Sequence, residues 1–537
     1  MDMTGIGIRA QRVTVVRVAA IAAVAFVAQV GVPQFGVAQG SAAQQLQPIA
    51  YTLRAPQPAT HVLQVEATIP TERRDSVDLM MAVWSPGYYR VEHYESRVRS
   101  FAARAADGTE LRFTQPAPNR WRIYTAGRPS VVMAYEVLSQ ERSVTLNWVD
   151  DTLAVLNGAP TFITLAEQAR RPHEVRLELA GLWKQSITSL ATAPDGAPNH
   201  YVARDYDELV DSPIVAGDLR IREFTVGNTR HVLASAGDVG AFDDQRAARD
   251  LAVIVEAQRR FWGTLPYPRY VFLNLFRRGG GGLEHLNSTL LTSSAGRLAT
   301  PRAYLGWLQF VSHEYFHAMN VKRLRPVELG PFDYERPPST TNLWISEGLT
   351  SYYGEILVQR SGLSTTTDAL ATLSSHIARV QNAPGRLVQT LEQSSLDVWS
   401  GGVSGIGRDT MTTVSYYEKG PVVGFLLDAR IRRVSNGRRS LDDVMRLAFA
   451  RHSGERGFTA AEFQKAAEEI AGTSLAAFFR QTLASTDELD YTEALDWFGL
   501  QFTSGEPRAA GAWTLSVRPD ATAAQQTHLR AWLPGTP

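Results

Sequence analysis

The chain has 537 residues, of which 54 are basic and 54 acidic, so its formal net charge is zero. Hydrophobic residues make up 44% and charged residues 20%, a composition typical of a soluble globular protein with about two to four domains. The balanced charge gives no reason to expect a nucleic-acid partner. Because cysteine is absent, disulfides, thiolate-held iron–sulfur clusters and a thiol nucleophile are excluded.

Residues 1–38 are predicted to be a bacterial-type signal peptide. Arginines at positions 9, 12 and 17 precede an apolar run from Val18 to Val32, and Gly36–Ala38 offers small residues for cleavage before Gln39. Cleavage after Ala43 is an alternative, and so is an uncleaved anchor, although the run is shorter than the ~20 residues that span a bilayer. We therefore expect an exported protein, periplasmic or secreted, without stable membrane insertion after cleavage.

Residues 45–225 are predicted to form an N-terminal β-rich domain. Apolar and polar residues alternate from Leu63 to Ile69, which is the period of a half-buried strand. Further strands are expected at 79–84, 120–124 and 131–138. Few titratable groups cluster here, so we expect a β-sandwich that packs against the second half of the chain.

Residues 226–487 change to a mainly helical pattern. A long helix is expected over 243–262 and a strand over 271–276, followed by four glycines at 279–282 whose backbone can approach a ligand closely. One later helix is expected to start near Asn342. Further helices are expected at 365–382, 417–434, 440–452, 459–471 and 474–484. Residues 488–537 are expected to be a short C-terminal extension, with a linker over 503–511 and no clear element after it.

The motif His313-Glu314-Tyr315-Phe316-His317 lies in an apolar run that is typical of a buried helix. Positions i and i+4 share a helix face, so His313 and His317 can bind one ion together. Zinc accepts imidazole nitrogens and keeps one position open for water in catalytic sites. Glu314 would take the proton of that water as general base. The motif predicts one Zn²⁺ ion and hydrolysis, most simply of a peptide bond; manganese or cobalt are alternatives in vitro.

A third ligand is needed, and Glu347 in Trp344-Ile345-Ser346-Glu347-Gly348 is the preferred candidate because it lies on the next predicted helix. The alternatives are Glu328, Asp333 and Glu335 in the intervening loop, Glu355 two turns further on, and His285.

Three segments resemble the M61 glycyl aminopeptidase family: Asn320–Pro326, Trp344–Gly348 and Trp84-Ser85-Pro86-Gly87-Tyr88. That family belongs to the gluzincins and is similar to the M1 aminopeptidases. The resemblance implies His313, His317 and Glu347 as ligands and Glu314 as general base. It implies an α+β multidomain fold, in which an N-terminal β-sandwich-like domain precedes a thermolysin-like, mainly helical zinc-peptidase domain.

Two further segments resemble M1 motifs. Gly281-Gly282-Leu283-Glu284-His285 looks like G-x-M-E-N, which implies that Glu284 binds the substrate's amino terminus, with Gly282 and His285 as neighbouring substrate contacts. Tyr417-Glu418-Lys419-Gly420 resembles Y-E-K-G, which implies that Tyr417 stabilises the tetrahedral intermediate; Tyr416 is the alternative donor. Met319 stands where the family more often has tryptophan, and the tail is too short for the complete PDZ domain found in many members.

The predicted function is that of a zinc aminopeptidase which removes small N-terminal residues, glycine or alanine, from peptide substrates. One alternative is a zinc endopeptidase, if Glu284 does not face the cleft. The other is a non-catalytic exported binding protein. The sequence does not indicate an oligomeric state.

Overall fold

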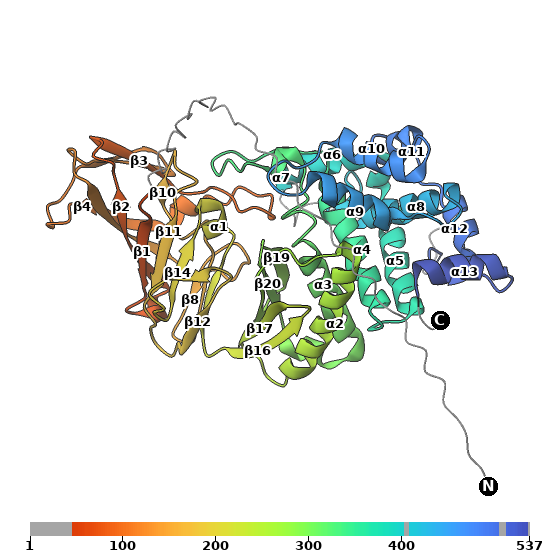
Figure 1. Cartoon of the computed structure of the whole chain (residues 1–537), viewed down its shortest axis with the longest axis horizontal. Coiled ribbons are helices and arrows are strands. Elements are labelled where there is room, and N and C mark those ends of the chain that lie inside the picture. The colour runs from red at the N-terminus through yellow and green to blue at the C-terminus, as the bar shows by residue number, and fades with distance from the viewer. Residues whose placement is uncertain (1–45, 402–407, 504–511, 535–537) are drawn as a thin grey trace, which may run out of the picture. The chain divides into compact units, whose positions relative to one another are not determined.

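The computed structural model describes residues 46–401, 408–503 and 512–534 (Figure 1). The predicted signal peptide and most of the predicted linker at 503–511 lie outside these ranges. Among the described helices, none has the length and hydropathy needed to cross a membrane.

The amino-terminal part consists of three sheets that share one hydrophobic core. The first has the order β13-β14-β11-β1-β2-β7-β4, the second β10-β3-β6-β5 and the third β12-β15-β9-β8. The strands are β1 (Ile49–Arg54), β2 (Val62–Pro70), β3 (Ser76–Met80), β4 (Val98–Arg104), β5 (Phe113–Ala117), β6 (Arg120–Tyr124), β7 (Ser130–Leu138), β8 (Trp148–Val149), β9 (Leu153–Leu156), β10 (Thr164–Leu165), β11 (His173–Leu177), β12 (Gln185–Ile187), β13 (Ala191–Thr192), β14 (His200–Ala203) and β15 (Ile214–Gly217). The short helices here are η1 (Pro58–Thr60), η2 (Tyr94–Arg97) and α1 (Tyr206–Val210). Alternate residues of β2 and β7 are buried, as the sequence pattern predicts.

The strand expected at 79–84 is wrong beyond its first two residues, because β3 ends at Met80. The chain leaves the sheet there, and Trp84 packs among aromatic rings from the second half of the chain, Phe332, Tyr334 and Trp399. Its indole N–H donates to the carbonyl of Asp333 at 2.8 Å. Met81 and Ala82 stay in the core of the amino-terminal part, whereas Trp84 contacts the second half of the chain, a difference that periodicity alone cannot reveal.

The second part begins with a five-stranded sheet of order β16-β17-β18-β20-β19. Its strands are β16 (Arg220–Val226), β17 (Thr229–Gly237), β18 (Arg269–Phe276), β19 (Gly281–Glu284) and β20 (Ser288–Ser293). Helices α2 (Asp244–Trp262) and α3 (Pro301–Phe316) cover one face (Figure 1). The other face shares a hydrophobic cluster with β9 and β15, so the sheet is buried on both sides. The edge strand of this sheet, β19, contacts α3.

The remaining elements form the helical part. They are η3 (Ala295–Ala299), η4 (Val327–Leu329), η5 (Trp344–Leu349), α4 (Thr350–Arg360), α5 (Thr366–Gln381), η6 (Pro384–Leu387), α6 (Leu391–Leu396), α7 (Val398–Gly401), α8 (Tyr416–Val434), α9 (Leu441–His452), α10 (Ala460–Ala471) and α11 (Ala476–Leu483). The helices expected from periodicity agree with α2, α5 and α8–α11 to within two residues. The helix expected near Asn342 begins instead as a π-helical segment, η5, which continues into α4.

The tail contains α12 (Thr492–Phe498), β21 (Leu500–Phe502), β22 (Leu515–Val517) and α13 (Ala523–Trp532). The sequence pattern predicted neither β22 nor α13. Trp532 packs on Phe425 and Phe498 and donates its indole N–H to the hydroxyl of Tyr352 at 2.9 Å. The tail thus contributes to the same core as helices α3, α4 and α8.

Candidate active site

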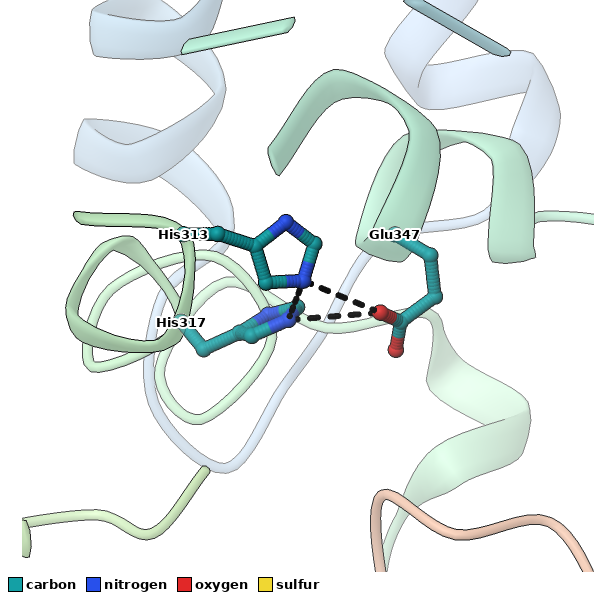
Figure 2. Close-up of side chains that lie close together, drawn as sticks. All are labelled: His313, His317 and Glu347. Atoms are coloured by element: carbon teal, nitrogen blue, oxygen red, sulfur yellow. Dashed lines mark hydrogen bonds and ion pairs between the residues drawn. The ribbon is translucent and has the colours of Figure 1, made fainter. Parts of the chain in front are cut away.

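His313 and His317 lie at the carboxyl end of α3. Pro301 at the first helical position and the Thr300 side chain, which accepts from the N–H of Ala303, start this helix, and His317 caps it in a helical conformation. The two imidazoles therefore share one face, and Glu347 of η5 points toward them (Figure 2). Nε2 of His317 lies 3.1 Å from Nε2 of His313 and 3.2 Å from Oε2 of Glu347, and the third separation is 3.8 Å.

These distances fit a metal ion. In tetrahedral coordination with bonds of about 2.0–2.1 Å, ligand atoms lie roughly 3.3–3.4 Å apart. The donor set of two imidazoles and one carboxylate is one that catalytic zinc uses. The alternatives considered for the third ligand point elsewhere: Glu335 pairs with Asn119 at 2.9 Å, and Glu355 pairs with His376 at 2.9 Å.

A hydrogen-bond partner orients each of the three side chains. Nδ1–H of His317 donates to the carbonyl of Asn320 at 2.8 Å, and Nδ1 of His313 lies 3.3 Å from the hydroxyl of Ser351. Both rings therefore present Nε2 to the site. The second oxygen of Glu347, Oε1, accepts from the hydroxyl of Tyr89 at 3.2 Å. Tyr89 comes from the amino-terminal part, and sequence reasoning did not identify it.

Two glycines bring Glu347 close to helix α8. A Cβ on Gly348 would lie 2.6 Å from the Cα of Gly420, and the reverse substitution would clash equally. The η5 segment is also held by Asn320, whose side-chain amide donates to the carbonyl of Ile345 at 2.8 Å and to the hydroxyl of Thr350 at 2.9 Å. The π-helical turn widens the backbone at the residue that carries the ligand, as such turns often do at functional sites.

A cleft of about 770 Å³ lies in front of the three residues. Glu314 borders it, 94% buried, and its carboxylate lies against Gly282 of the edge strand β19. A Cβ on Gly282 would come within 2.1 Å of Oε1 of Glu314. Because Gly282 has no side chain, strand β19 can pack directly against the carboxylate of Glu314.

Glu284 lies at the other end of β19, also on the cleft. It is 4% exposed, and its Oε1 has no hydrogen-bond partner within the described residues. One ligand atom each from Glu284, Glu314 and His317 lie within 4.8 Å of one another. Gly87, with φ +94°, backs this carboxylate, since a Cβ there would lie 2.4 Å from Oε1 of Glu284. The sequence prediction that Glu284 faces the site therefore has a geometric basis.

The electrostatics of the site favour a bound cation. Burial, together with the charges of Glu284 and Glu347, raises the pKa of Glu314 well above its ordinary value. Burial also raises the pKa of Glu284. Although burial opposes protonation of His317, the carboxylates of Glu347 and Glu284 raise its pKa to about 9. A divalent ion beside these carboxylates would add positive charge to that of Lys322, which also acts on Glu314 and Glu284.

Tyr417 and Tyr416 occupy different surroundings at the start of α8. Tyr417 borders the cleft, and its ring centroid lies 6.3 Å from that of His313. Tyr416 is fully buried, and its hydroxyl has no partner in the described part of the chain. Burial and the charge of Glu347 raise the pKa of Tyr417 well above its ordinary value, so its phenol keeps a proton to donate.

His285 does not border the cleft. Its ring is 97% buried, with Nδ1 3.1 Å from a carboxylate oxygen of Asp211. Asp211 also pairs with Lys322 at 2.8 Å and accepts from the N–H of Leu286 at 2.6 Å. This network anchors the chain just after Glu284 to the amino-terminal part, and the substrate contact expected of His285 has no place in the cleft.

Models of two protein families match separate segments of the chain. Residues 50–218 match the family model of the peptidase M61 N-terminal domain, and residues 306–423 match that of the M61 glycyl aminopeptidase. Together the two ranges cover just over half of the chain. A search of curated proteins found no match.

Solved structures share the fold. An aminopeptidase N family protein from Idiomarina loihiensis superposes with a TM-score of 0.80 and 27% identity, covering 84% of this chain and 78% of that chain. An M1 zinc metallopeptidase variant from Deinococcus radiodurans, bound to a Tyr-Ser-Ala substrate, gives a TM-score of 0.51 and 15% identity over 83% and 95% of the two chains. The expected α+β architecture, with a β-rich N-terminal part and a helical part of the aminopeptidase N type, is confirmed, and a metallopeptidase is supported.

Proposed function

The chain belongs to the M61 glycyl aminopeptidase family, and from that premise we propose that it is a zinc aminopeptidase which removes single residues from the amino termini of peptides. His313, His317 and Glu347 would hold one zinc ion. When bound, zinc supplies a Lewis acid that lowers the pKa of water and polarises a carbonyl.

Glu314 acts as the general base in this proposal. Its carboxylate adjoins the cleft beside His317 and takes a proton from the attacking water, whose oxygen forms a bond to the scissile carbonyl carbon. The same carboxyl then delivers the proton to the departing amine as the C–N bond breaks.

Tyr417 stabilises the negative charge that develops on the carbonyl oxygen. Its protonated phenol borders the cleft near His313 and can donate a hydrogen bond to that oxygen. Such a contact is stronger in the transition state than in the ground state, so it accelerates the reaction. The hydroxyl of Tyr416 is enclosed, which makes it the weaker candidate.

The position of Glu284 is the observation that carries the choice of an aminopeptidase. An ammonium group bonded to its carboxylate would lie about 2.8 Å from it. The carbonyl carbon of the first residue then lies about 2.5 Å further, whereas the next carbonyl lies roughly one residue, 3.8 Å, beyond. Because ligand atoms of Glu284, Glu314 and His317 lie within 4.8 Å of one another, the first carbonyl is the one within reach. Glu284 thus sets the register at one residue.

A preference for glycine or alanine at the first position is proposed from the family alone. Export is likewise proposed from the amino-terminal sequence pattern of residues 1–38.

The test is hydrolysis of Gly-Ala-Ala peptides with free and with acetylated amino termini. We expect cleavage of the first bond of the free peptide only, lost with a chelator and restored by zinc. E284Q should raise KM for the free peptide, whereas E328Q, at an exposed carboxylate outside the cleft, should not. Equal cleavage of acetylated peptides would support the endopeptidase instead. Binding of zinc without cleavage of either would support the non-catalytic protein.

A further inference from the structure

Arg277 is a buried arginine on the cleft wall without an acidic partner. It follows β18, borders the cleft and is only 8% exposed. Its Nη2 donates to the carbonyl of Ser143 at 2.9 Å, but Nε and Nη1 have no hydrogen-bond partner among the described residues. Buried guanidinium groups are normally paired, since an unpaired one loses its hydration without compensation.

The surroundings of Arg277 add positive rather than negative charge. Among the described residues no carboxylate lies within 4.0 Å of it. The neighbouring Arg142 also borders the cleft, and its guanidinium stacks on the ring of Trp148 at 4.2 Å. Burial and Arg142 together lower the pKa of Arg277 to about 10, which still leaves it charged at neutral pH. This part of the wall therefore offers two cations and no described anion.

The direction of strand β19 indicates where the two arginines lie relative to Glu284 and Glu314. The strand is the edge of its sheet and runs from Gly281 to Glu284. Glu284 is at its carboxyl end, Gly282 adjoins Glu314, and the chain before Gly281 leads back through Gly280 to Arg277. A substrate whose ammonium meets Glu284 and whose first carbonyl meets Glu314 must therefore continue toward Gly280 and Arg277.

The spacing indicates which part of the substrate arrives there. Gly280 is two residues before Gly282, and an extended chain advances about 3.3–3.4 Å per residue. The portion of substrate that follows the cleaved bond by one or two residues would thus face the arginines.

We propose that Arg277, with Arg142 beside it, binds a carboxylate on the leaving-group side of the substrate, at about its third residue. The inference rests on the proposed aminopeptidase function and extends it to substrate length and charge. A carboxylate matches the planar guanidinium and can accept from the unpaired Nε and Nη1 after a small side-chain adjustment. It has two sources: the C-terminal carboxylate of a tripeptide, or an acidic side chain at the third position of a longer peptide.

The experiment compares three free-amine substrates with the zinc-loaded full chain: Gly-Ala-Ala free acid, its C-terminal amide, and Gly-Ala-Asp amide. We expect kcat/KM for the free acid to exceed that for its amide by about ten- to a hundredfold, mainly through KM, because hydrogen bonds to a charged group are lost in the amide. Restored cleavage of Gly-Ala-Asp amide would identify an acidic side chain as an accepted source. No restoration would restrict the site to a C-terminal carboxylate.

Variants assign the preference to Arg277. R277Q should bring the ratio of free acid to amide close to one, and R277K should retain part of it. R278Q is the matched control, because Arg278 is the exposed arginine next in sequence and does not border the cleft. Its ratio should equal that of the wild type. If R277Q does not fold, as judged by circular dichroism, the ratio of kcat/KM for the free acid to that for the amide in the wild type still tests whether a carboxylate is bound.

Three results would overturn the inference in distinguishable ways. If wild type cleaves the free acid and the amide within twofold of each other, the carboxylate site is refuted while the aminopeptidase stands. If it cleaves neither, the proposed function fails and the inference falls with it. An acid preference that persists in R277Q would assign the carboxylate to another residue.

Discussion

Replacing Tyr89 by phenylalanine tests whether the amino-terminal part supports the metal site. The hydroxyl of Tyr89 donates to Oε1 of Glu347 at 3.2 Å, while Oε2 of the same carboxylate faces His317 at 3.2 Å. Tyr89 is 98% buried, and its ring packs edge-on against Trp399 with centroids 6.0 Å apart. The Y89F variant keeps the ring and removes only the donor.

The size of the effect follows from the hydrogen bond. A bond to a charged group contributes about 1.5–3 kcal/mol, and the rather long 3.2 Å distance favours the lower end. A loss of about 1.5 kcal/mol weakens zinc binding roughly tenfold. This agrees with the 10–100-fold losses of affinity that typically follow removal of a residue supporting a metal ligand.

The assay is competition for zinc between the protein and a chromogenic chelator. Y94F is the control, because Tyr94 is a buried tyrosine of the same segment whose hydroxyl pairs with Ser85 at 2.8 Å and not with Glu347. We expect weaker zinc binding in Y89F and unchanged binding in Y94F. Zinc affinity of Y89F within twofold of wild type would refute the argument that Tyr89 supports Glu347.

Three further predictions concern the base, the glycine contact and a histidine on the cleft wall. E314Q should keep zinc binding and lower kcat about 10²–10⁴-fold, since it removes only the proton acceptor; retained turnover in a peptide assay would contradict the assigned role. G348A should cost about 1–3 kcal/mol in urea unfolding and weaken zinc binding, because its Cβ would meet the Gly420 backbone at 2.6 Å; G296A, at a site with open space, is the control, and equal stability of the two variants would disprove the contact. His376 lies between Glu418 at 2.6 Å and Glu355 at 2.9 Å; although burial opposes it, these carboxylates raise its pKa to about 10. Its protonated form therefore stabilises the fold below pH ~6.5, and this stability is lost as the pH rises from ~6.5 through ~10, so melting temperature should fall over that range in wild type and less steeply in H376Q.

The elements that could be predicted from sequence are those whose pattern is local. Helix α5, from Thr366 to Gln381, shows its buried positions at helical spacing and starts with a capping box. The pair His313 and His317 is likewise a local signal, because four residues suffice to place both imidazoles on one helix face. Glu347 could be predicted as the third ligand because a helix was expected in its region. The detailed backbone conformation of that helix did not affect the choice of ligand.

The features that escaped prediction depend on contacts between distant segments. The π-helical segment η5 contacts Asn320 and Gly420, and neither contact shows in the periodicity of residues 344–349. Tyr89 lies more than 250 positions before the carboxylate that it contacts. The last helix, α13, is short and is stabilised by packing of Trp532 on Phe498, so its own sequence carries a weak signal.

Glycines lie at the points where the short sequence motifs of this chain contact one another. Gly87 of the segment Trp84–Tyr88 backs Glu284, Gly282 backs Glu314, and Gly348 meets Gly420. At each of these positions the space that a Cβ would need is already filled. The carboxylates of Glu284 and Glu314 fill it at Gly87 and Gly282, and the backbone of α8, the helix that carries Tyr417, fills it at Gly348. These glycines lie where one motif touches another, and any larger residue there would displace a group that is proposed to take part in catalysis. The resemblance carried by these motifs thus reflects a mutual packing constraint in addition to the identity of the ligands.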